Sequence, residues 1–279
     1  FWDMTGRQWG VLAAAWVGWG FDVFDALLFN YVSTNCITTL LGLELGTPEA
    51  REASVFWTGV ASSVLLIGAA IGGIGFGRVA DRIGRSKTML LTMGLYAVAT
   101  AACALAPNLA SLIVLRFVAA LGIGGEWAAG AAMVAEVVPE KRRVQAGALL
   151  YTAAPIGLFL ATGVNSLIAG HWLKSDPSTS WRWIFAVGIL PAIAALLLRI
   201  GLREPERWTA VKTAPTRFAE LFAPEVRRNT LSGLAMALTG MLMWWGCNAF
   251  IPLIAAGLGD AQAVVLGLGG GDRQAFVEA

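Results

Sequence analysis

Four ionisable side chains lie inside long apolar stretches of the sequence, where charges are rare: Asp22, Asp25, Arg116 and Glu126. A charge at the centre of a bilayer costs about 3 kcal/mol on insertion scales, so such residues face a protein interior or a wet cavity, usually in pairs. A desolvated carboxylate can take up a proton. An arginine can hold a carboxylate through two parallel hydrogen bonds. These residue types therefore predict proton movement coupled to the binding of a small anion.

The spacing of these residues indicates how they would lie on helices. Asp22 and Asp25 are three residues apart and share one helical face. Arg116 and Glu126 are separated by roughly 15 Å along a helix axis and about 80° around it. We expect these two to line one sector of a cavity at two depths. The alternative interpretation is a buried ion pair with a purely structural role.

The composition is that of a membrane protein. The 279 residues are 57% hydrophobic and 14% charged, whereas a soluble domain carries about 25% charged residues. The single His171 and the widely spaced Cys36, Cys103 and Cys247 do not form a metal-binding or disulfide pattern. We find no nucleophile–base pair and no nucleotide-binding loop. We therefore expect no enzyme activity, no cofactor, no metal and no nucleic-acid partner.

Seven apolar spans of about 20 residues or slightly more are long enough to cross a bilayer. They are Trp9–Val32, Val55–Phe76, Thr88–Ala106, Ala110–Ala135, Val144–Ala169, Trp181–Ile200 and Asn229–Ala256. The predicted organisation is a six-helix bundle over residues 1–200, a polar linker over residues 201–228, and a seventh helix with its following outer loop over residues 229–279.

The distribution of basic residues predicts the orientation of these spans. With a cytoplasmic N-terminus, 15 Lys and Arg residues fall in inner segments and 4 in outer segments, with Arg116 inside a span. Cytoplasmic loops carry the excess of positive charge. We therefore expect an integral protein of the bacterial inner membrane with its N-terminus in the cytoplasm and the lipid bilayer as its surroundings.

Two local patterns predict how the spans are packed. Glycines in the second span recur four residues apart, as Gly68/Gly72 and Gly73/Gly77, which lets a neighbouring helix approach closely. The sixth span begins with Trp181-Arg182-Trp183. Paired tryptophans near the end of a span are typical of the membrane interface, so both rings are predicted at headgroup level.

Several motifs resemble those of the major facilitator superfamily of transporters. Residues 77–87 are similar to its loop G-x-x-x-D-R-x-G-R-[RK]-[RK], with Ser86 in place of a basic residue. Residues 116–127 resemble R-F-x-x-G-x-G-x-G-G-E-W/Y of its metabolite:proton symporters, with Ala120 in place of a glycine. Residues 136–143 resemble the E-x-x-P-x-x-x-R end of that helix. Residues 202–208 resemble the P-E-S-x-R-W segment of sugar and organic-acid porters, and residues 21–25 the acidic first helix of the sialic and aromatic acid branches.

This resemblance implies an all-α transmembrane fold of twelve helices in two halves. The chain would then comprise the six-helix N-terminal bundle and a seventh helix, with the C-terminal half of the same protein as an expected partner. The resemblance also implies a cytoplasmic gate. Its expected residues are Gly77, Asp81, Arg82, Gly84, Arg85, Glu136 and Arg143.

The seventh span carries Trp244, Trp245 and Asn248, which could face a substrate or serve only in packing. The leading hypothesis for function is proton-coupled symport of a small organic anion such as a sialic, aromatic or other carboxylic acid. A proton-coupled porter of neutral sugars is an alternative, because sugar porters carry a similar pattern. A transporter-like sensor that does not transport is a third.

Overall fold

The computed structural model describes residues 4–190, 193, 197, 204 and 218–266. The chain divides into two compact units, Phe1–Pro215 and Thr216–Ala279. All regular elements in the described part of the chain are helices.

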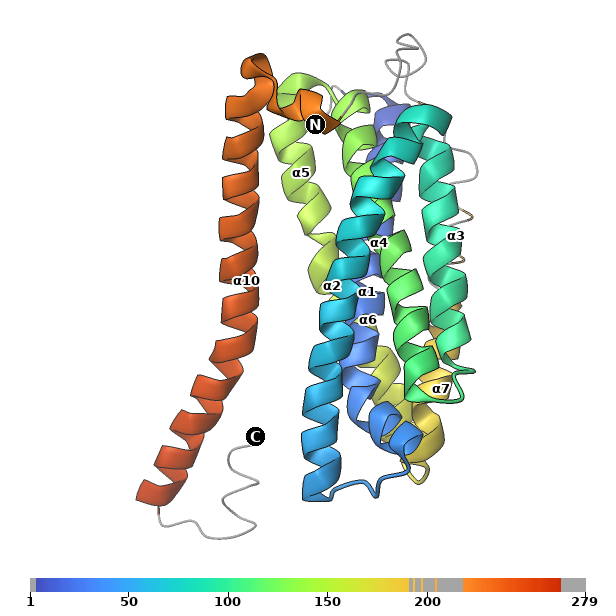
Figure 1. The fold of residues 1–279 in the computed structure, drawn as a ribbon, viewed down its shortest axis with the longest axis vertical. Helices are drawn as coiled ribbons and strands as arrows, with labels where there is room; N and C mark the ends of the chain where they lie inside the picture. Colours follow the sequence, from blue (N-terminus) through green and yellow to red (C-terminus); the bar gives the residue numbers. More distant parts are fainter. Residues whose placement is uncertain (1–3, 191–192, 194–196, 198–203, 205–217, 267–279) are drawn as a thin grey trace. The chain divides into compact units, whose positions relative to one another are not determined.

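The first unit is a bundle in which successive long helices run up and down (Figure 1). Its elements are α1 (Gly6–Leu41), α2 (Pro48–Ile83), α3 (Arg85–Cys103), α4 (Leu109–Val137), η1 (Glu140–Arg142), α5 (Arg143–Tyr151), α6 (Ala153–Asn165), η2 (Ser166–Trp172) and α7 (Pro177–Val187). We call the end where α2 meets α3 the Arg85 end, and the opposite end, where α7 begins, the Trp181 end.

The helix boundaries follow from local hydrogen bonding. Thr5 and Gln8 form a reciprocal capping box at the start of α1, which satisfies backbone N–H groups that have no partner within the helix. Asn108 and Ser111 do the same for α4. The α1 helix ends at Leu41 and is capped by Gly42, whose φ of 69° is left-handed, a conformation that glycine adopts without steric cost.

α4 packs most extensively against α2 and α3, and glycines permit the close approach. A side-chain carbon at Gly72 would overlap the backbone of Leu121, and one at Gly124 would overlap the backbone of Ala69. A side-chain carbon at Gly68 would lie 2.8 Å from the Cβ of Ala120 and 3.0 Å from the carbonyl oxygen of Phe117, closer than ordinary contact. The predicted tight packing is confirmed for Gly68 and Gly72. An added Cβ at Gly73 would lie at an ordinary contact distance of 3.5 Å from the Gly124 carbonyl oxygen, and at Gly77 it would have nothing within 4 Å.

The predicted fifth span, Val144–Ala169, lies within the run Glu140–Trp172, which is long and apolar enough to cross a membrane but is not one regular helix. α5 ends at Tyr151 and α6 begins at Ala153. Pro155 has no N–H to donate to the carbonyl of Tyr151, so the regular hydrogen-bond pattern cannot pass this point. The run then ends in the π-helical turn η2. Pro155 is the sequence signal for this break, and the prediction of the span did not take it into account.

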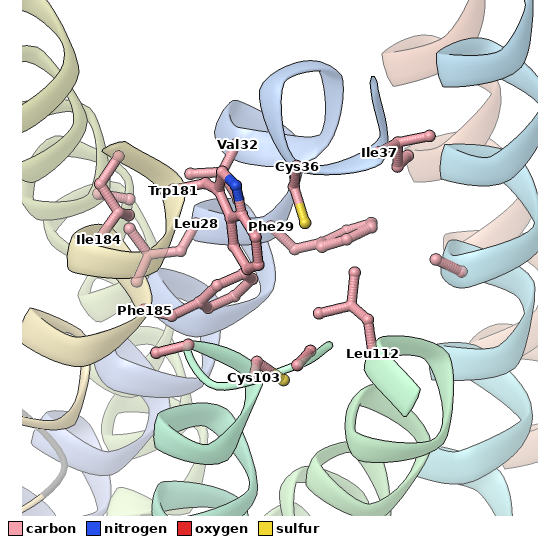
Figure 2. Packing of buried hydrophobic residues seen from close by; sticks show 14 of the residues in the cluster. Leu28, Phe29, Val32, Cys36, Ile37, Cys103, Leu112, Trp181, Ile184 and Phe185 are labelled. Carbon is pink, nitrogen blue, oxygen red and sulfur yellow. The ribbon is translucent and has the colours of Figure 1, made fainter. Parts of the chain in front are cut away.

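The interface prediction for Trp181 is also wrong. Its side chain is fully buried in the core at the Trp181 end, where its ring meets Phe185 edge-on at a centroid distance of 6.3 Å (Figure 2). Cys36 and Cys103 lie in the same core. Trp183 is 57% exposed, as an interfacial ring would be. The local pattern could not tell the two tryptophans apart, because only α7 packing decides which one faces inward.

Arg182 binds the backbone that follows the C-terminus of α3 at the Trp181 end. Its Nη1 donates to the carbonyl oxygens of Ala104 at 2.7 Å and Ala106 at 3.1 Å, just after the last residue of α3. The guanidinium lies 4.1 Å from the centroid of the Trp181 ring. A cation favours both the unpaired carbonyls at a helix C-terminus and the face of an indole ring.

Asp176, which precedes α7, is held by local hydroxyl groups. Ser178 and Thr179 each donate to its carboxylate at 2.6 Å, and these bonds lower the pKa of Asp176.

The second unit contains η3 (Phe218–Phe222) and the long helix α10 (Pro224–Val265). The predicted seventh span, Asn229–Ala256, falls within α10. Much of the predicted linker and the end of the predicted sixth span lie outside the described residues, and the domain boundaries stay a prediction. In the described part, four stretches are long and apolar enough to cross a membrane, namely α1, α2, α4 and the run Glu140–Trp172.

Candidate functional site

A buried ion pair joins α1 to α4 inside the bundle. Nη1 of Arg116 donates to Oδ2 of Asp25 at 3.0 Å, and the two side chains are 1% and 5% exposed. Thr100 on α3 donates its hydroxyl to the other oxygen of Asp25 at 2.8 Å. The guanidinium also lies 5.3 Å from the centroid of the Phe29 ring. The pair thus connects three helices and satisfies both oxygens of Asp25.

The guanidinium of Arg116 keeps unused donor capacity. Its Nε and Nη2 are buried and have no hydrogen-bond partner. These two nitrogens form one edge of the guanidinium, and such an edge binds a carboxylate through two parallel hydrogen bonds. A buried donor without a partner carries a desolvation cost. Arg116 therefore offers an anion-binding edge that its bond to Asp25 does not occupy.

The other two intramembrane acids share a small pocket. Asp22 on α1 and Glu126 on α4 are each 3% exposed. The pocket is lined by Ala15, Trp19, Asp22, Glu126, Trp127, Gly130, Ala131 and Leu150. Its free volume of about 10 Å³ is on the order of what one water molecule needs. The pocket can hold water or a proton carrier in this form, but it has no room for an organic acid.

The structure therefore sorts the four predicted residues into two sites. Asp22 and Asp25 lie on the same helix, but Asp25 bonds to Arg116 whereas Asp22 lines the pocket with Glu126. Arg116 does not line that pocket. Sequence spacing placed the residues in the same region of the bundle, and the pairing depended on how α1 packs against α4. The roles of all four residues stay predictions.

Three aromatic rings adjoin the pocket, and the sequence analysis did not identify them as a site. The Trp19 and Trp127 ring centroids are 4.2 Å apart with their planes tilted by 34°. Tyr151 meets Trp19 edge-on at 5.9 Å and Trp127 at 6.2 Å. We call these three residues the aromatic cluster. Trp127 directly follows Glu126, and Trp19 lies one turn before Asp22. Their spacing to the acids could have indicated from the sequence that these tryptophans belong to the site.

The predicted gate residues meet in part at the Arg85 end. Arg85 donates from Nη1 to Asp81 at 2.8 Å, and from Nε and Nη2 to Glu136 at 3.1 and 2.9 Å. Nη1 also donates to the carbonyl of Ala80. Arg85 thus ties the end of α2 to the end of α4. Because Asp81 is 40% exposed, we expect its bond to add little to stability.

The remaining gate residues have different surroundings. In the described part of the bundle, the Nε of Arg143 is buried without a hydrogen-bond partner, so this nitrogen does not join the Arg85–Glu136 ion pair. Arg82 is exposed. Gly84 joins α2 to α3 with a φ of 110°, and the Glu204 carboxylate packs against it. A side chain at position 84 would be strained and would displace that carboxylate.

Glu204 is a further residue at this end to which the sequence analysis gave no role. Its carboxylate accepts hydrogen bonds from the backbone N–H groups of Ser86 and Lys87, both at 3.2 Å, in the first turn of α3. Arg7 donates to its backbone carbonyl at 2.9 Å. A carboxylate at a helix N-terminus is stabilised by the free N–H groups and by the helix dipole. Its position in segment 202–208, which resembles the P-E-S-x-R-W segment of the superfamily, could have indicated a role from the sequence.

We expect the Glu204→Ala variant to loosen the start of α3. Loss of a capping group costs about 1 kcal/mol, and the Ser86 and Lys87 amides would lose their acceptor. Hydrogen–deuterium exchange of the peptide that contains these amides should become faster. Glu44→Ala, which removes an exposed loop carboxylate, is the matched control. Unchanged exchange in Glu204→Ala would contradict the capping role.

Trp244, Trp245 and Asn248 lie on α10, but their side chains are outside the described residues. Their predicted orientation toward a substrate stays a prediction.

Comparison with known proteins identifies the family. The family model described as Major Facilitator Superfamily matches residues 23–271. The chain belongs to this superfamily. The superfamily consists of transporters rather than enzymes, and its membership confirms the predicted all-α transmembrane fold class.

Individual transport proteins resemble the chain over most of its length. A cis,cis-muconate transport protein of Acinetobacter baylyi is 32% identical over 83% of the chain and 54% of its own length. The sialic acid transporter NanX of Escherichia coli is 29% identical over 71% of the chain and 44% of its own length. The proton:xylose symporter XylE has the same fold, with a TM-score of 0.65 and 20% identity over 93% of the chain and 61% of its own length. The chain spans about half the length of these curated relatives.

Proposed function

We propose that the full-length protein is a secondary active transporter that carries a small organic anion together with protons by alternating access. The observation that carries this proposal is the unused edge of the buried Arg116, a fixed positive group that can bind a carboxylate. A neutral sugar can accept hydrogen bonds from this edge but cannot pair with its charge, so the edge favours an anion. The relatives named for muconate and sialic acid also carry organic acids.

In this proposal the two acid sites have different roles. Asp25 already accepts bonds from Arg116 and Thr100, so a proton on Asp25 would have to break the ion pair. Asp22 and Glu126 line a pocket that can hold about one water molecule. We assign the transported proton to Asp22 and Glu126. Asp25 holds Arg116 until an anion binds.

The surroundings of the protein are part of the proposal. The excess of basic residues in the predicted inner segments supports a cytoplasmic N-terminus in a bacterial inner membrane. We also propose that a second bundle of the same protein faces this one and completes the substrate site. In superfamilies with two related halves, the substrate lies at the interface between them.

Glu126→Gln tests the coupling. Glutamine keeps the shape of the side chain but cannot exchange a proton, so we expect accumulation driven by a pH gradient to be lost. The measurement is uptake of labelled sialic, aromatic and dicarboxylic acids and of xylose by the full-length protein in vesicles, with and without the gradient. Exchange without a gradient should persist in the variant.

Glu52→Gln, which alters an exposed carboxylate on α2, is the matched control and should leave uptake unchanged. Intact proton-driven accumulation in Glu126→Gln would refute the assignment of the proton to this residue. Uptake of xylose in preference to all the acids would refute the anion proposal.

A further inference from the structure

The aromatic cluster beside the acid pocket suggests which organic anion fits best. We propose that Trp19 and Trp127 form a stacking subsite for a flat conjugated ring, and that Tyr151 occupies this subsite when no ligand is bound. The substrate is then an aromatic or similarly conjugated carboxylic acid. This inference rests on the proposed function and assigns its substrate class. The subsite is a position separate from the Arg116 edge, because Arg116 does not line the pocket.

The tryptophan rings of the aromatic cluster lie at the acid pocket. Trp19 and Trp127 line the pocket together with Asp22 and Glu126. Their centroid distance of 4.2 Å leaves no space for a third ring between them. A ligand ring must therefore meet them from outside the pair, and Tyr151 covers one such side. Tyr151 contacts both indoles edge-on, and the residue is 60% exposed.

The aromatic cluster contains a hydrogen-bond donor without an acceptor. The indole Nε1 of Trp19 is buried and has no hydrogen-bond partner. Buried tryptophan N–H groups usually find an acceptor, because an unpaired donor costs free energy. By contrast, the indole of Trp16, one turn earlier on α1, donates to the Thr152 hydroxyl at 2.9 Å. An oxygen of a bound acid would satisfy the donor of Trp19.

The charge of the pocket determines when an acid can bind there. The pocket has two carboxyl groups and no basic residue in its lining. A carboxylate ligand is therefore repelled while Asp22 and Glu126 are ionised, and it is accepted once they carry protons. The ring of the ligand then stacks on the tryptophans, where ring–ring geometry is worth about 2- to 12-fold in affinity beyond simple burial. Aromatic acid and proton would bind together.

The test compares two acids of similar size and equal charge. Benzoate is flat and conjugated, and cyclohexanecarboxylate is saturated. We expect the full-length protein at pH 6 to bind benzoate about 2- to 12-fold more tightly than cyclohexanecarboxylate, measured by competition against labelled benzoate. Trp127→Leu should remove this difference, and Trp127→Phe should keep part of it. Trp183→Leu, which alters an exposed tryptophan on α7, should behave as wild type.

Tyr151→Ala should change benzoate affinity in the opposite direction to Trp127→Leu. Removing the ring that occupies the subsite should strengthen benzoate binding, because the ligand no longer competes with tyrosine. A structural role for Tyr151 would give weaker binding instead. Thermal unfolding of each variant separates a lost subsite from a lost fold, and the gain expected for Tyr151→Ala cannot arise from misfolding.

Three outcomes would overturn the inference. They are equal binding of benzoate and cyclohexanecarboxylate, weaker binding by Tyr151→Ala, and preferential competition by benzylammonium, since indole faces and two carboxylates can also hold a cation. Failure of the proposed function would look different. Benzoate would still bind more tightly than cyclohexanecarboxylate at equilibrium, but a pH gradient would drive uptake of neither.

Discussion

Replacing Arg116 with methionine is expected to lower the free energy of unfolding by about 3–5 kcal/mol, because it leaves the buried carboxylate of Asp25 without its counter-ion. Asp25 is 3% exposed and cannot recover its hydration without opening the bundle. The variant should therefore unfold at a lower temperature in detergent and should express poorly. Arg51→Met, which alters an exposed arginine near the start of α2, should have little effect.

The double variant Asp25→Leu/Arg116→Met separates stability from function. Replacing both members of a buried ion pair with apolar residues is often neutral or stabilising, so most of the lost stability should return. Transport should not return, because the anion-binding edge of Arg116 is gone. A double variant that is as unstable as Arg116→Met alone would mean that the loss came from packing rather than from the unpaired charge.

Gly124→Ala is expected to cost about 3 kcal/mol, near the upper end of the usual cost of overpacking. The added carbon would overlap the backbone of Ala69 on α2, and a backbone cannot move aside as a flexible side chain can. α2 and α4 would have to separate along the seam where they pack most extensively. We expect a lower unfolding temperature and a larger susceptibility to proteolysis.

Gly75→Ala is the matched control, since it adds the same methyl group to a helical glycine with nothing within 4 Å. Alanine is the better helix former, so this variant should be neutral or slightly stabilised. Equal unfolding temperatures for the two variants would show that the α2–α4 seam adjusts easily, and would contradict close packing as the reason for the glycine.

The length and apolarity of the spans predicted the long helices α1, α2 and α4, because a bilayer fixes how long a crossing segment must be. The glycine spacing of the second span also predicted its tight seam with a neighbour, and Gly68 and Gly72 confirm it. Neither pattern says which helix is the neighbour. That depends on how whole helix surfaces fit together, which no local window contains.

The same limit explains the errors at particular residues. Trp181 and Trp183 have the same local signal, and only the packing of α7 makes one a core residue and the other an exposed one. The acids at positions 22 and 25 were correctly placed at mid-bundle on one helix. Their separation into an ion pair and a pocket follows from contacts with α4 about 90 residues later in the sequence.

The interruption at Thr152 has a mechanical consequence for the aromatic cluster. Tyr151 is the last residue of α5, whereas Trp19 and Trp127 lie within the unbroken helices α1 and α4. Helices bend most easily where a proline removes a backbone bond. If α5 pivots there, its terminal ring swings with it and the two indoles stay where they are. The joint would then work as a hinged cover, opened by a rotation at one residue rather than by a rearrangement of the bundle.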